Sequence, residues 1–167
     1  MPSKTFNNLK PEKQQKIFQS LLKEFSTFPL AKSQVARIIK SANIPRGSFY
    51  TYFSNLKDAY MYVLNIVLQD IHIDLNFQSF NNLDLIIGKI ENFIKKIQYQ
   101  NYYQFIKLYF QYNESILPKH PVNKKTDTKT WMLSVLSHTT LKDIFLDINN
   151  QKFYLDRFKK AIIYFQR

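Results

Sequence analysis

The sequence predicts an all-α protein, and three observations support that prediction. Apolar residues recur at helical spacing along almost all of its 167 residues. Only two glycines are present, which leaves little for the tight turns that β-hairpins need. The chain has no cysteine, which excludes disulfides, thiolate metal sites and cysteine nucleophiles. Its 45% apolar and 22% charged residues are those of an ordinary globular protein, long enough to bury a core.

Four helices are expected in the N-terminal part of the chain. The first begins near Pro11, a residue that suits a first helical turn. It places Ile17, Leu21 and Phe25 on one apolar face. The other three follow at residues 34–40, at residues 45–53 and from residue 55 onward.

The C-terminal part of the chain is expected to form four more helices. They lie at residues 82–98, 101–115, 128–148 and 151–166. Each has an apolar stripe wide enough to pack on both sides, as in a helical bundle or a dimer interface. The loop-like interval in this part is residues 117–130, which contain Pro118 and Pro121.

The net charge of +12 suggests a polyanionic partner, either nucleic acid or an anionic membrane surface. Lysine outnumbers arginine 20 to 4, and a codon bias would produce such an excess by itself. The distribution of charge is more informative than the total. Residues 1–57 carry ten basic and two acidic residues, a net of +8, whereas residues 58–167 carry fourteen and ten. Most of the excess therefore lies in the first third of the chain.

Residues 33–53 have the dimensions of a helix-turn-helix, two short helices joined by a turn. Ser33 is expected to cap the first of these helices. Asn43 lies where the chain must reverse, and asparagine tolerates a left-handed backbone better than most non-glycine residues. Pro45 suits the first position of the second helix and holds Ile44 extended, as an N-cap residue requires.

The outward face of the second helix is expected to carry groups that read DNA. They are Arg46, Gly47, Ser48, Tyr50, Thr51 and Tyr52. A guanidinium binds guanine or phosphate, hydroxyls bind phosphate, and a glycine lets the backbone approach the duplex closely. Phe49 and Phe53 are expected in the core, and partly buried packing is the alternative for Tyr50 and Tyr52. Lys4 and Lys10 could reach DNA as an N-terminal arm, but the sequence favours a disordered tail for them.

The segment from Ser33 to Tyr60 resembles the DNA-binding signature of the TetR (tetracycline-repressor-type) transcriptional regulators. Its most specific part is Arg46-Gly-Ser-Phe-Tyr-Thr-Tyr-Phe53, and the likeness extends over about residues 9–64. The resemblance implies an all-α homodimer whose three N-terminal helices bind the major groove. It also implies a linker helix and a C-terminal bundle that dimerises and senses a small ligand. The expected domains are residues 1–54 for DNA binding and 55–167 for dimerisation and sensing.

The same resemblance assigns the DNA contacts residue by residue. They fall on Ser33, Arg46, Gly47, Ser48, Tyr50, Thr51, Tyr52 and Lys57. Three positions depart from the family pattern. Asn43 replaces the usual turn glycine, and Pro45 replaces the usual capping serine. Leu56 stands where the family often has a phosphate-binding lysine, which leaves open whether Lys57 takes over that contact.

Two further sets of residues in the C-terminal part follow from the resemblance. A ligand cavity would be lined by Phe93, Tyr102, Phe105, Tyr109 and Tyr112. The same aromatic density also suits a plain bundle core. Glu91 and Glu114 are the acids close to this set, available to a cationic ligand. A four-helix dimer interface would use the last two helices, through Trp131, Val135, Leu136, Phe158, Ile162 and Phe165.

Other clusters of titratable residues are weaker signals. Asp70, His72 and Asp74 are close in sequence, but on a helix His72 points away from the two acids, so the three cannot hold one ion. His120 and His138 have no catalytic or metal-ligating partner at motif spacing. We therefore expect neither an enzyme nor a bound cofactor.

The sequence thus favours a cytoplasmic, homodimeric, ligand-responsive repressor that binds a palindromic operator in double-stranded DNA. It shows no signal-peptide pattern and no apolar stretch long enough for a membrane span. The alternative is a basic helical protein that binds an acidic protein or a membrane surface without reading DNA sequence. That alternative predicts lysines spread along one amphipathic face rather than a clustered motif. An enzyme built on a helical bundle would need a convergent titratable site, which the sequence does not show.

Overall fold

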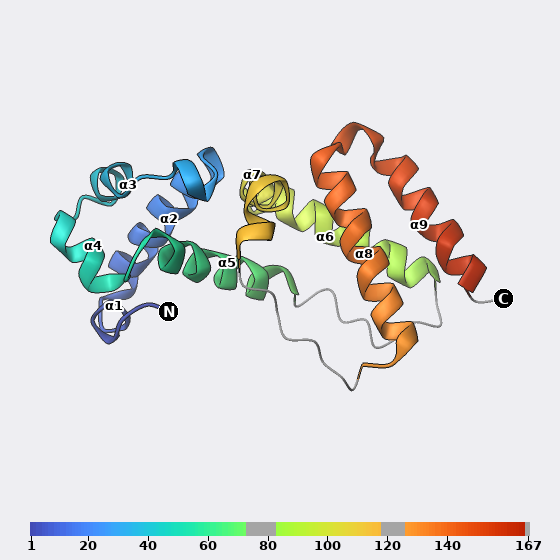
Figure 1. The fold of residues 1–167 in the computed structure, drawn as a ribbon, viewed down its shortest axis with the longest axis horizontal. Coiled ribbons are helices and arrows are strands. Elements are labelled where there is room, and N and C mark those ends of the chain that lie inside the picture. Colours follow the sequence, from blue (N-terminus) through green and yellow to red (C-terminus); the bar gives the residue numbers. More distant parts are fainter. Residues whose placement is uncertain (73–82, 118–125, 166–167) are drawn as a thin grey trace. The chain divides into compact units, whose positions relative to one another are not determined.

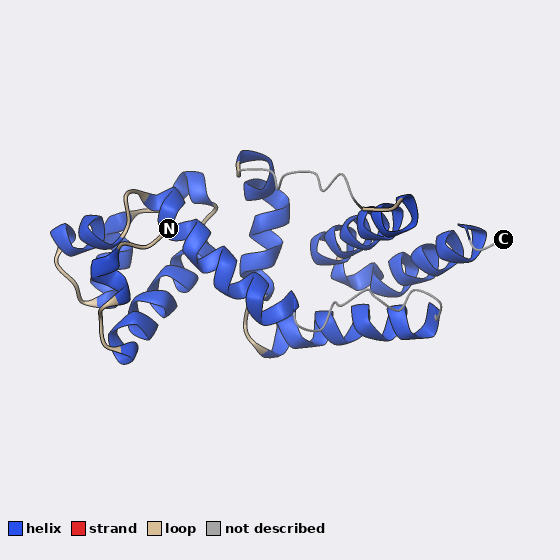
Figure 2. Cartoon of the chain, turned by 90° about the horizontal axis from the view of Figure 1, so that it is seen from below, coloured by secondary structure: helices blue, strands red, loops and turns tan. Residues whose placement is uncertain are grey.

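The computed structural model describes residues 1–72, 83–117 and 126–165. Over these ranges all regular structure is helical (Figure 1, Figure 2), which confirms the all-α prediction. Within the same ranges, the helices are too short or too polar to cross a bilayer.

The chain divides into two compact units. The first unit comprises residues 1–70 and 104–113, and the second comprises residues 71–103 and 114–167. The first unit therefore combines the N-terminal helices with a segment that returns from the C-terminal part of the chain.

The N-terminal helices of the first unit agree with the predicted ones to within about two residues. They are α2 (Pro11–Thr27), α3 (Val35–Ala42), α4 (Arg46–Tyr52) and α5 (Leu56–His72), with a 3₁₀ turn, η1 (Leu30–Lys32), after α2. The returning segment supplies α7 (Tyr103–Leu108), apart from its first residue, and a π-helical turn, η2 (Tyr109–Asn113).

The N-terminal segment is folded, which corrects the expectation of a disordered tail. A short helix, α1 (Lys4–Asn7), begins after Ser3, whose hydroxyl accepts a hydrogen bond from the Phe6 amide at 3.2 Å. Phe6 is 1% exposed. Its ring centroid lies 5.1 Å from that of Phe53 and 5.1 Å from that of Tyr62. The burial of one aromatic ring thus orders a helix that is too short to show any periodicity in the sequence.

The returning segment is tied to the first unit through Asn113, which is 1% exposed. Its side-chain oxygen accepts a hydrogen bond from the Leu30 amide at 3.0 Å, and its side-chain nitrogen donates to the Tyr60 hydroxyl at 3.1 Å. Tyr60 is fully buried between the rings of Phe25 and Phe105, at centroid distances of 5.0 and 5.2 Å. This burial raises the pKa of Tyr60 well above its usual value, so the hydroxyl stays neutral.

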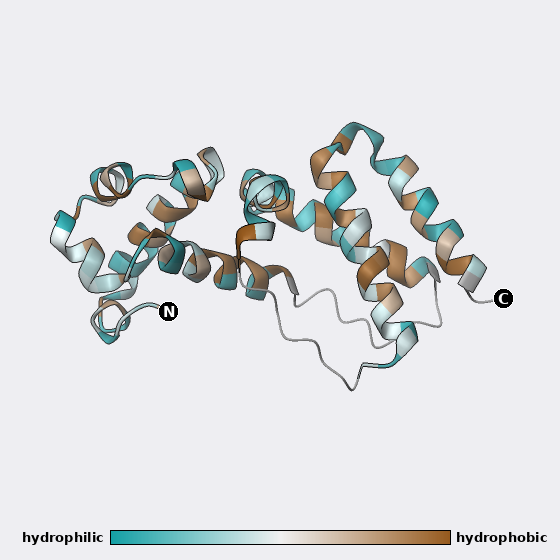
Figure 3. Ribbon diagram, in the orientation of Figure 1, coloured by the Kyte–Doolittle hydropathy of each residue, from teal (hydrophilic) through white to brown (hydrophobic). Residues whose placement is uncertain are grey.

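The described part of the second unit contains three longer helices with short 3₁₀ turns. They are α6 (Leu83–Tyr99), η3 (Glu114–Ile116), α8 (Thr128–Leu146), η4 (Ile148–Asn150) and α9 (Gln151–Phe165). Hydrophobic and hydrophilic residues are interspersed along both α8 and α9 (Figure 3). The predicted helix at residues 101–115 is instead divided into α7, η2 and η3. Asn101, at one end of that stretch, is left-handed, with φ 60°, and Asn113, near the other end, is held by its two hydrogen bonds.

The core of the second unit is centred on Phe145, which is fully buried. Its ring packs against Phe93 at a centroid distance of 6.5 Å and against Tyr103 at 5.6 Å. At the surface of α8, the Glu114 carboxylate pairs with His138 at 2.8 Å and with Lys142 at 2.5 Å. These contacts hold η3 against α8.

Replacing Asn113 by alanine is expected to destabilise the first unit. The change leaves the Leu30 amide and the Tyr60 hydroxyl without their partner inside the protein, which costs on the order of 2–4 kcal/mol. Urea unfolding followed by circular dichroism measures the loss, and hydrogen exchange at the Leu30 amide localises it. Asn92→Ala, at an exposed position of α6, is the matched control and stays within about 0.5 kcal/mol of the parent protein. Unchanged protection of the Leu30 amide in Asn113→Ala would contradict the assignment.

Candidate nucleic-acid interface

Helices α3 and α4 form a helix-turn-helix (Figure 1). Asn43 at the turn is left-handed, with φ 54° and ψ 54°, which confirms the prediction made from its residue type. The Ile44 amide then donates to the Ile39 carbonyl at 3.1 Å, which closes the end of α3. The N-cap of α4 is Pro45 rather than Ile44, so this helix begins one residue later than predicted.

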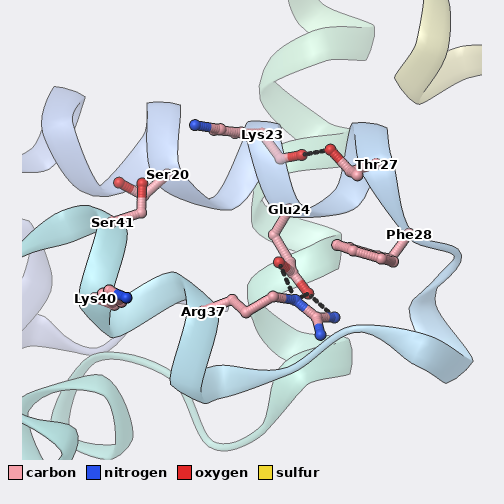
Figure 4. Close-up of a pocket in the computed structure, with 8 residues that line it drawn as sticks. All are labelled: Ser20, Lys23, Glu24, Thr27, Phe28, Arg37, Lys40 and Ser41. Carbon is pink, nitrogen blue, oxygen red and sulfur yellow. Dashed lines mark hydrogen bonds and ion pairs between the residues drawn. The ribbon is translucent and has the colours of Figure 1, made fainter.

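A buried carboxylate holds α3 against α2. Glu24 of α2 is 5% exposed and accepts hydrogen bonds from the Arg37 guanidinium at 2.6 to 3.0 Å, so that the two side chains meet as a fork (Figure 4). Arg37 also donates to the Lys32 carbonyl at 2.8 Å, and its guanidinium lies 3.9 Å from the centroid of the Phe28 ring. The hydrogen bonds to Glu24 raise the pKa of Arg37 further above its usual value.

Glu24 also takes the place of a capping side chain for α3. The N-cap of α3 is Gln34, whose side chain makes no capping hydrogen bond. The Gln34 amide instead donates to the Glu24 carboxylate at 2.8 Å. In a capping box, a glutamate within the helix accepts this same amide, whereas here the glutamate comes from another helix. Glu24 therefore fixes both where α3 begins and how it lies on α2.

The predicted N-cap Ser33 has a different position and role. It is 8% exposed, and its hydroxyl lies within hydrogen-bonding distance of the Phe28 and Pro29 carbonyls, at 3.3 and 3.2 Å. The capping role expected for it is wrong, and its burial leaves little surface for a DNA contact. Its hydroxyl stabilises the loop between α2 and α3 instead.

The exposed face of α4 carries four of the residues predicted to bind DNA. Arg46, Gly47, Tyr50 and Thr51 are all exposed, Tyr50 to 49%. The Tyr50 ring meets that of Phe49 edge-on at a centroid distance of 5.3 Å, which steadies it at the surface. A guanidinium and a phenol thus project from one short helix, and the Thr51 hydroxyl beside them donates to the Gly47 carbonyl at 3.1 Å. Of the other predicted residues, Ser48 is half-buried and Lys57, at the start of α5, is exposed.

Tyr52 does not belong to this face, which corrects the expectation that it points outward. It is 5% exposed, and its ring packs against Phe6 at a centroid distance of 5.8 Å. Its backbone carbonyl accepts a hydrogen bond from the Ser3 amide at 3.0 Å. The N-terminal segment covers Tyr52, and the sequence pattern of α4 by itself does not reveal that cover.

Gly47 is a glycine that the fold does not require. A Cβ atom built at this position would meet nothing within 4 Å, and its φ angle is not in the left-handed region. Glycine in a helix is less stable than alanine by roughly 0.5–1 kcal/mol. A close approach by something outside the chain would account for the absence of a side chain here.

The charge around the helix-turn-helix is almost entirely positive. In residues 1–57, all of which the structure describes, nine of the ten basic side chains are exposed. Of the two acidic residues in that range, Glu24 is buried and paired with Arg37, so Glu12 is the exposed one. Such an excess attracts a polyanion.

The residues predicted to line a ligand cavity are divided between the two units. Phe93 and Tyr102 are buried in the second unit, whereas Phe105 is fully buried in the first unit against Tyr60. Tyr109 is half-buried and Tyr112 is 51% exposed. Their role in ligand binding stays a prediction.

A groove of about 490 Å³ lies between α6 and α9 in the second unit. Its lining consists of Ile87, Glu91, Gln151, Lys152, Leu155, Asp156 and Lys159. It therefore includes Glu91, one of the two acids expected near a ligand, but none of the predicted aromatic residues. The other acid, Glu114, is engaged with His138 and Lys142.

The residues predicted for a dimer interface separate into exposed and buried ones. Trp131 and Val135 are 57% and 45% exposed, and Leu136 is half-buried. Phe158 and Ile162 are only 2% and 4% exposed, which corrects their expected place at the surface. They belong to the side of α9 that packs within its own unit. Phe165 is also predicted for the interface, and its side chain lies outside the described residues.

Some sequence predictions concern residues that the structure does not describe. Asp74 and His120 lie outside the described residues, as does the side chain of His72. Among the described residues, no group of three His, Asp or Glu side chains is placed to hold a metal ion.

Comparison with known proteins identifies the fold. No family model matches the chain, and no curated protein does. Among solved structures, the chain is similar to a TetR family transcriptional regulator from Chloroflexus aurantiacus J-10-FL, with 18% sequence identity and a TM-score of 0.55. The match covers 98% of this chain and 96% of that one. The chain therefore has the all-α fold of a TetR-type regulator.

Replacing Glu24 by alanine is expected to destabilise the helix-turn-helix. The substitution removes the acceptor for the Gln34 amide and for Arg37, at a cost of about 2 kcal/mol. Glu12→Ala is the matched control, because Glu12 is an exposed glutamate on the same helix, and it should change stability by less than about 0.5 kcal/mol. Urea midpoints of the two variants make the comparison. Equal midpoints would show that the carboxylate of Glu24 does not hold α3 in place.

Proposed function

We propose that the protein is a sequence-specific DNA-binding regulator of transcription. The observation that carries the proposal is the exposed face of α4, where Arg46, Tyr50 and Thr51 flank a glycine that the fold does not need. An arginine reads guanine or binds phosphate, and tyrosine and threonine hydroxyls bind phosphate. The surrounding positive charge supplies the non-specific attraction to the duplex. Similarity in fold to a TetR family transcriptional regulator agrees with this reading.

We further propose that the protein acts as a homodimer through α8 and α9. These helices leave large apolar side chains exposed: Trp131, Val135 and Leu146 on α8, and Phe153, Ile163 and Tyr164 on α9. An exposed apolar surface of this kind is typical of protein–protein interfaces. A second copy of the chain would cover it with matching residues, because a two-fold interface uses the same surface on both subunits.

A dimer of this kind would bind a palindromic operator. Its two copies of α4 would enter successive major grooves about one helical turn apart, roughly 34 Å. We propose that the protein represses transcription and responds to a ligand, in which case the ligand must bind more tightly to the state that does not bind the operator. The resemblance of the DNA-binding segment to TetR-type regulators supports this part of the proposal.

The Arg46→Ala and Tyr50→Ala variants test the DNA-binding face. Loss of one good base or phosphate contact is expected to weaken binding by about 1–3 kcal/mol, roughly five- to 150-fold. The probe is a duplex selected by the full chain from a random-sequence pool, and fluorescence anisotropy gives the affinity. Well-folded variants that bind this duplex as tightly as the parent protein would refute the assignment.

Gly47→Ala provides the companion measurement. Because a Cβ at residue 47 meets nothing in the protein, the substitution should leave stability unchanged or raise it by up to about 1 kcal/mol. Binding to the selected duplex should nevertheless fall. A variant that keeps both its stability and its affinity would show that nothing outside the chain approaches Gly47 closely.

The Val135→Glu variant tests the dimer. A charge within the apolar surface of α8 should prevent its burial, so the variant should be monomeric with the 20.0 kDa mass of one chain. The parent protein should sediment at twice that mass. Asn92→Glu, which introduces the same charge at an exposed position of α6, is the control and should stay dimeric. A dimeric Val135→Glu would place the interface elsewhere.

A further inference from the structure

The short N-terminal helix α1 lies directly against the recognition helix α4 (Figure 1). The Ser3 amide donates to the carbonyl of Tyr52, the last residue of α4, at 3.0 Å. The Phe6 ring, 1% exposed, packs against Tyr52 and Phe53 at centroid distances of 5.8 and 5.1 Å. These contacts fix α1 at the C-terminal end of α4.

The link from α1 to α2 is held as firmly. The side-chain amide of Gln14 donates to the Asn7 carbonyl at 3.1 Å and to the Leu9 carbonyl at 2.9 Å. The Leu9 amide donates to the Phe6 carbonyl at 3.0 Å, which tightens the turn after α1. The chain from Ser3 to the first turn of α2 is therefore an ordered structure rather than a free arm.

The outer surface of this structure is polar and positively charged. Phe6 points into the core, whereas the exposed residues of α1 and its C-cap are Lys4, Thr5, Asn7 and Asn8. Lys10 and Lys13, at the start of α2, are exposed as well. Glu12 is the exposed acid among them. Three ammonium groups, three hydroxyl or amide side chains and one carboxylate make a surface suited to phosphate.

We propose that α1 and the first turn of α2 form a second DNA-binding element, in which Lys4, Lys10 and Lys13 bind backbone phosphates beside the groove that α4 enters. The proposal rests on the DNA-binding function proposed above and extends the contact beyond α4. Lysine contacts of this kind position the protein and carry no sequence information. Because α1 is already ordered, binding does not have to order a free arm, and more of the electrostatic attraction contributes to affinity. The element also compensates for Leu56 at the start of α5, which stands where TetR-type regulators often have a phosphate-binding lysine.

The test compares two double variants that remove equal charge. Lys4→Gln with Lys10→Gln removes two lysines of the proposed element. Lys23→Gln with Lys32→Gln removes two other exposed lysines, one in the C-terminal half of α2 and one at the end of η1. Lys23 lies about 20 Å along α2 from Lys10. That separation exceeds the Debye length of about 8 Å at physiological salt. Circular dichroism checks that both variants are folded.

The measured quantity is the salt dependence of binding to the selected duplex and to an unrelated mixed-sequence duplex. The slope of log K against log salt concentration should fall by about 0.9 for every phosphate contact that is lost. We expect this decrease for the Lys4 and Lys10 variant on both duplexes, and no change in its preference between them. The Lys23 and Lys32 variant should keep the slope of the parent protein. Trimming the base pairs that flank the selected site should remove the difference between the two variants.

Three results would overturn the proposal. Equal slopes for the two double variants would show that the N-terminal lysines make no phosphate contact. A changed preference between the two duplexes with an unchanged slope would assign Lys4 or Lys10 to base reading. If the parent protein binds neither duplex, the DNA-binding function itself fails together with this extension. A parent protein that binds while the two variants behave alike refutes the extension alone.

Discussion

The position of the helix-turn-helix depends on one buried carboxylate. Glu24 accepts hydrogen bonds from Arg37 and from the amide that starts α3, so a single side chain of α2 sets both the origin and the orientation of α3. From there the left-handed Asn43 reverses the chain into α4. The buried Phe49 then fixes the rotation of α4 about its own axis. The direction in which Arg46 projects is thus determined by a contact two helices away.

Local chemistry predicts much of this arrangement from the sequence. Asn43 and Pro45 have backbone preferences that hold in any surroundings, and the structure shows the turn where those preferences place it. Periodicity gives α2, α5, α6, α8 and α9 because each has at least fifteen residues. It cannot give α1, whose single buried residue, Phe6, has meaning only once the rings of Tyr52 and Phe53 are in place.

The incorrect predictions share a physical cause. In helices that are apolar over a wide arc, the sequence does not tell which apolar residues face the protein's own core. Tyr52 is buried by the N-terminal segment, and Phe158 and Ile162 are buried within the second unit, whereas Trp131 and Val135 on a similar stripe are exposed. The same limit applies to Ser33, a residue typical of a helix N-cap, because Glu24 already occupies the capping role. Burial is a tertiary property, and the exposed set follows only from the packed structure.

Asn113 gives the first unit an unusual dependence on chain order. The hydroxyl of Tyr60 and the amide of Leu30 find their partner in a residue that follows α6 in the sequence. The polypeptide must therefore leave the first unit, build α6 and return before that unit is complete. During synthesis on the ribosome, the N-terminal helices emerge well before Asn113, with Tyr60 still lacking its cover. The packing of the first unit is thus completed only after Asn113 has been synthesised. A fragment that ends with α5 would lack this packing.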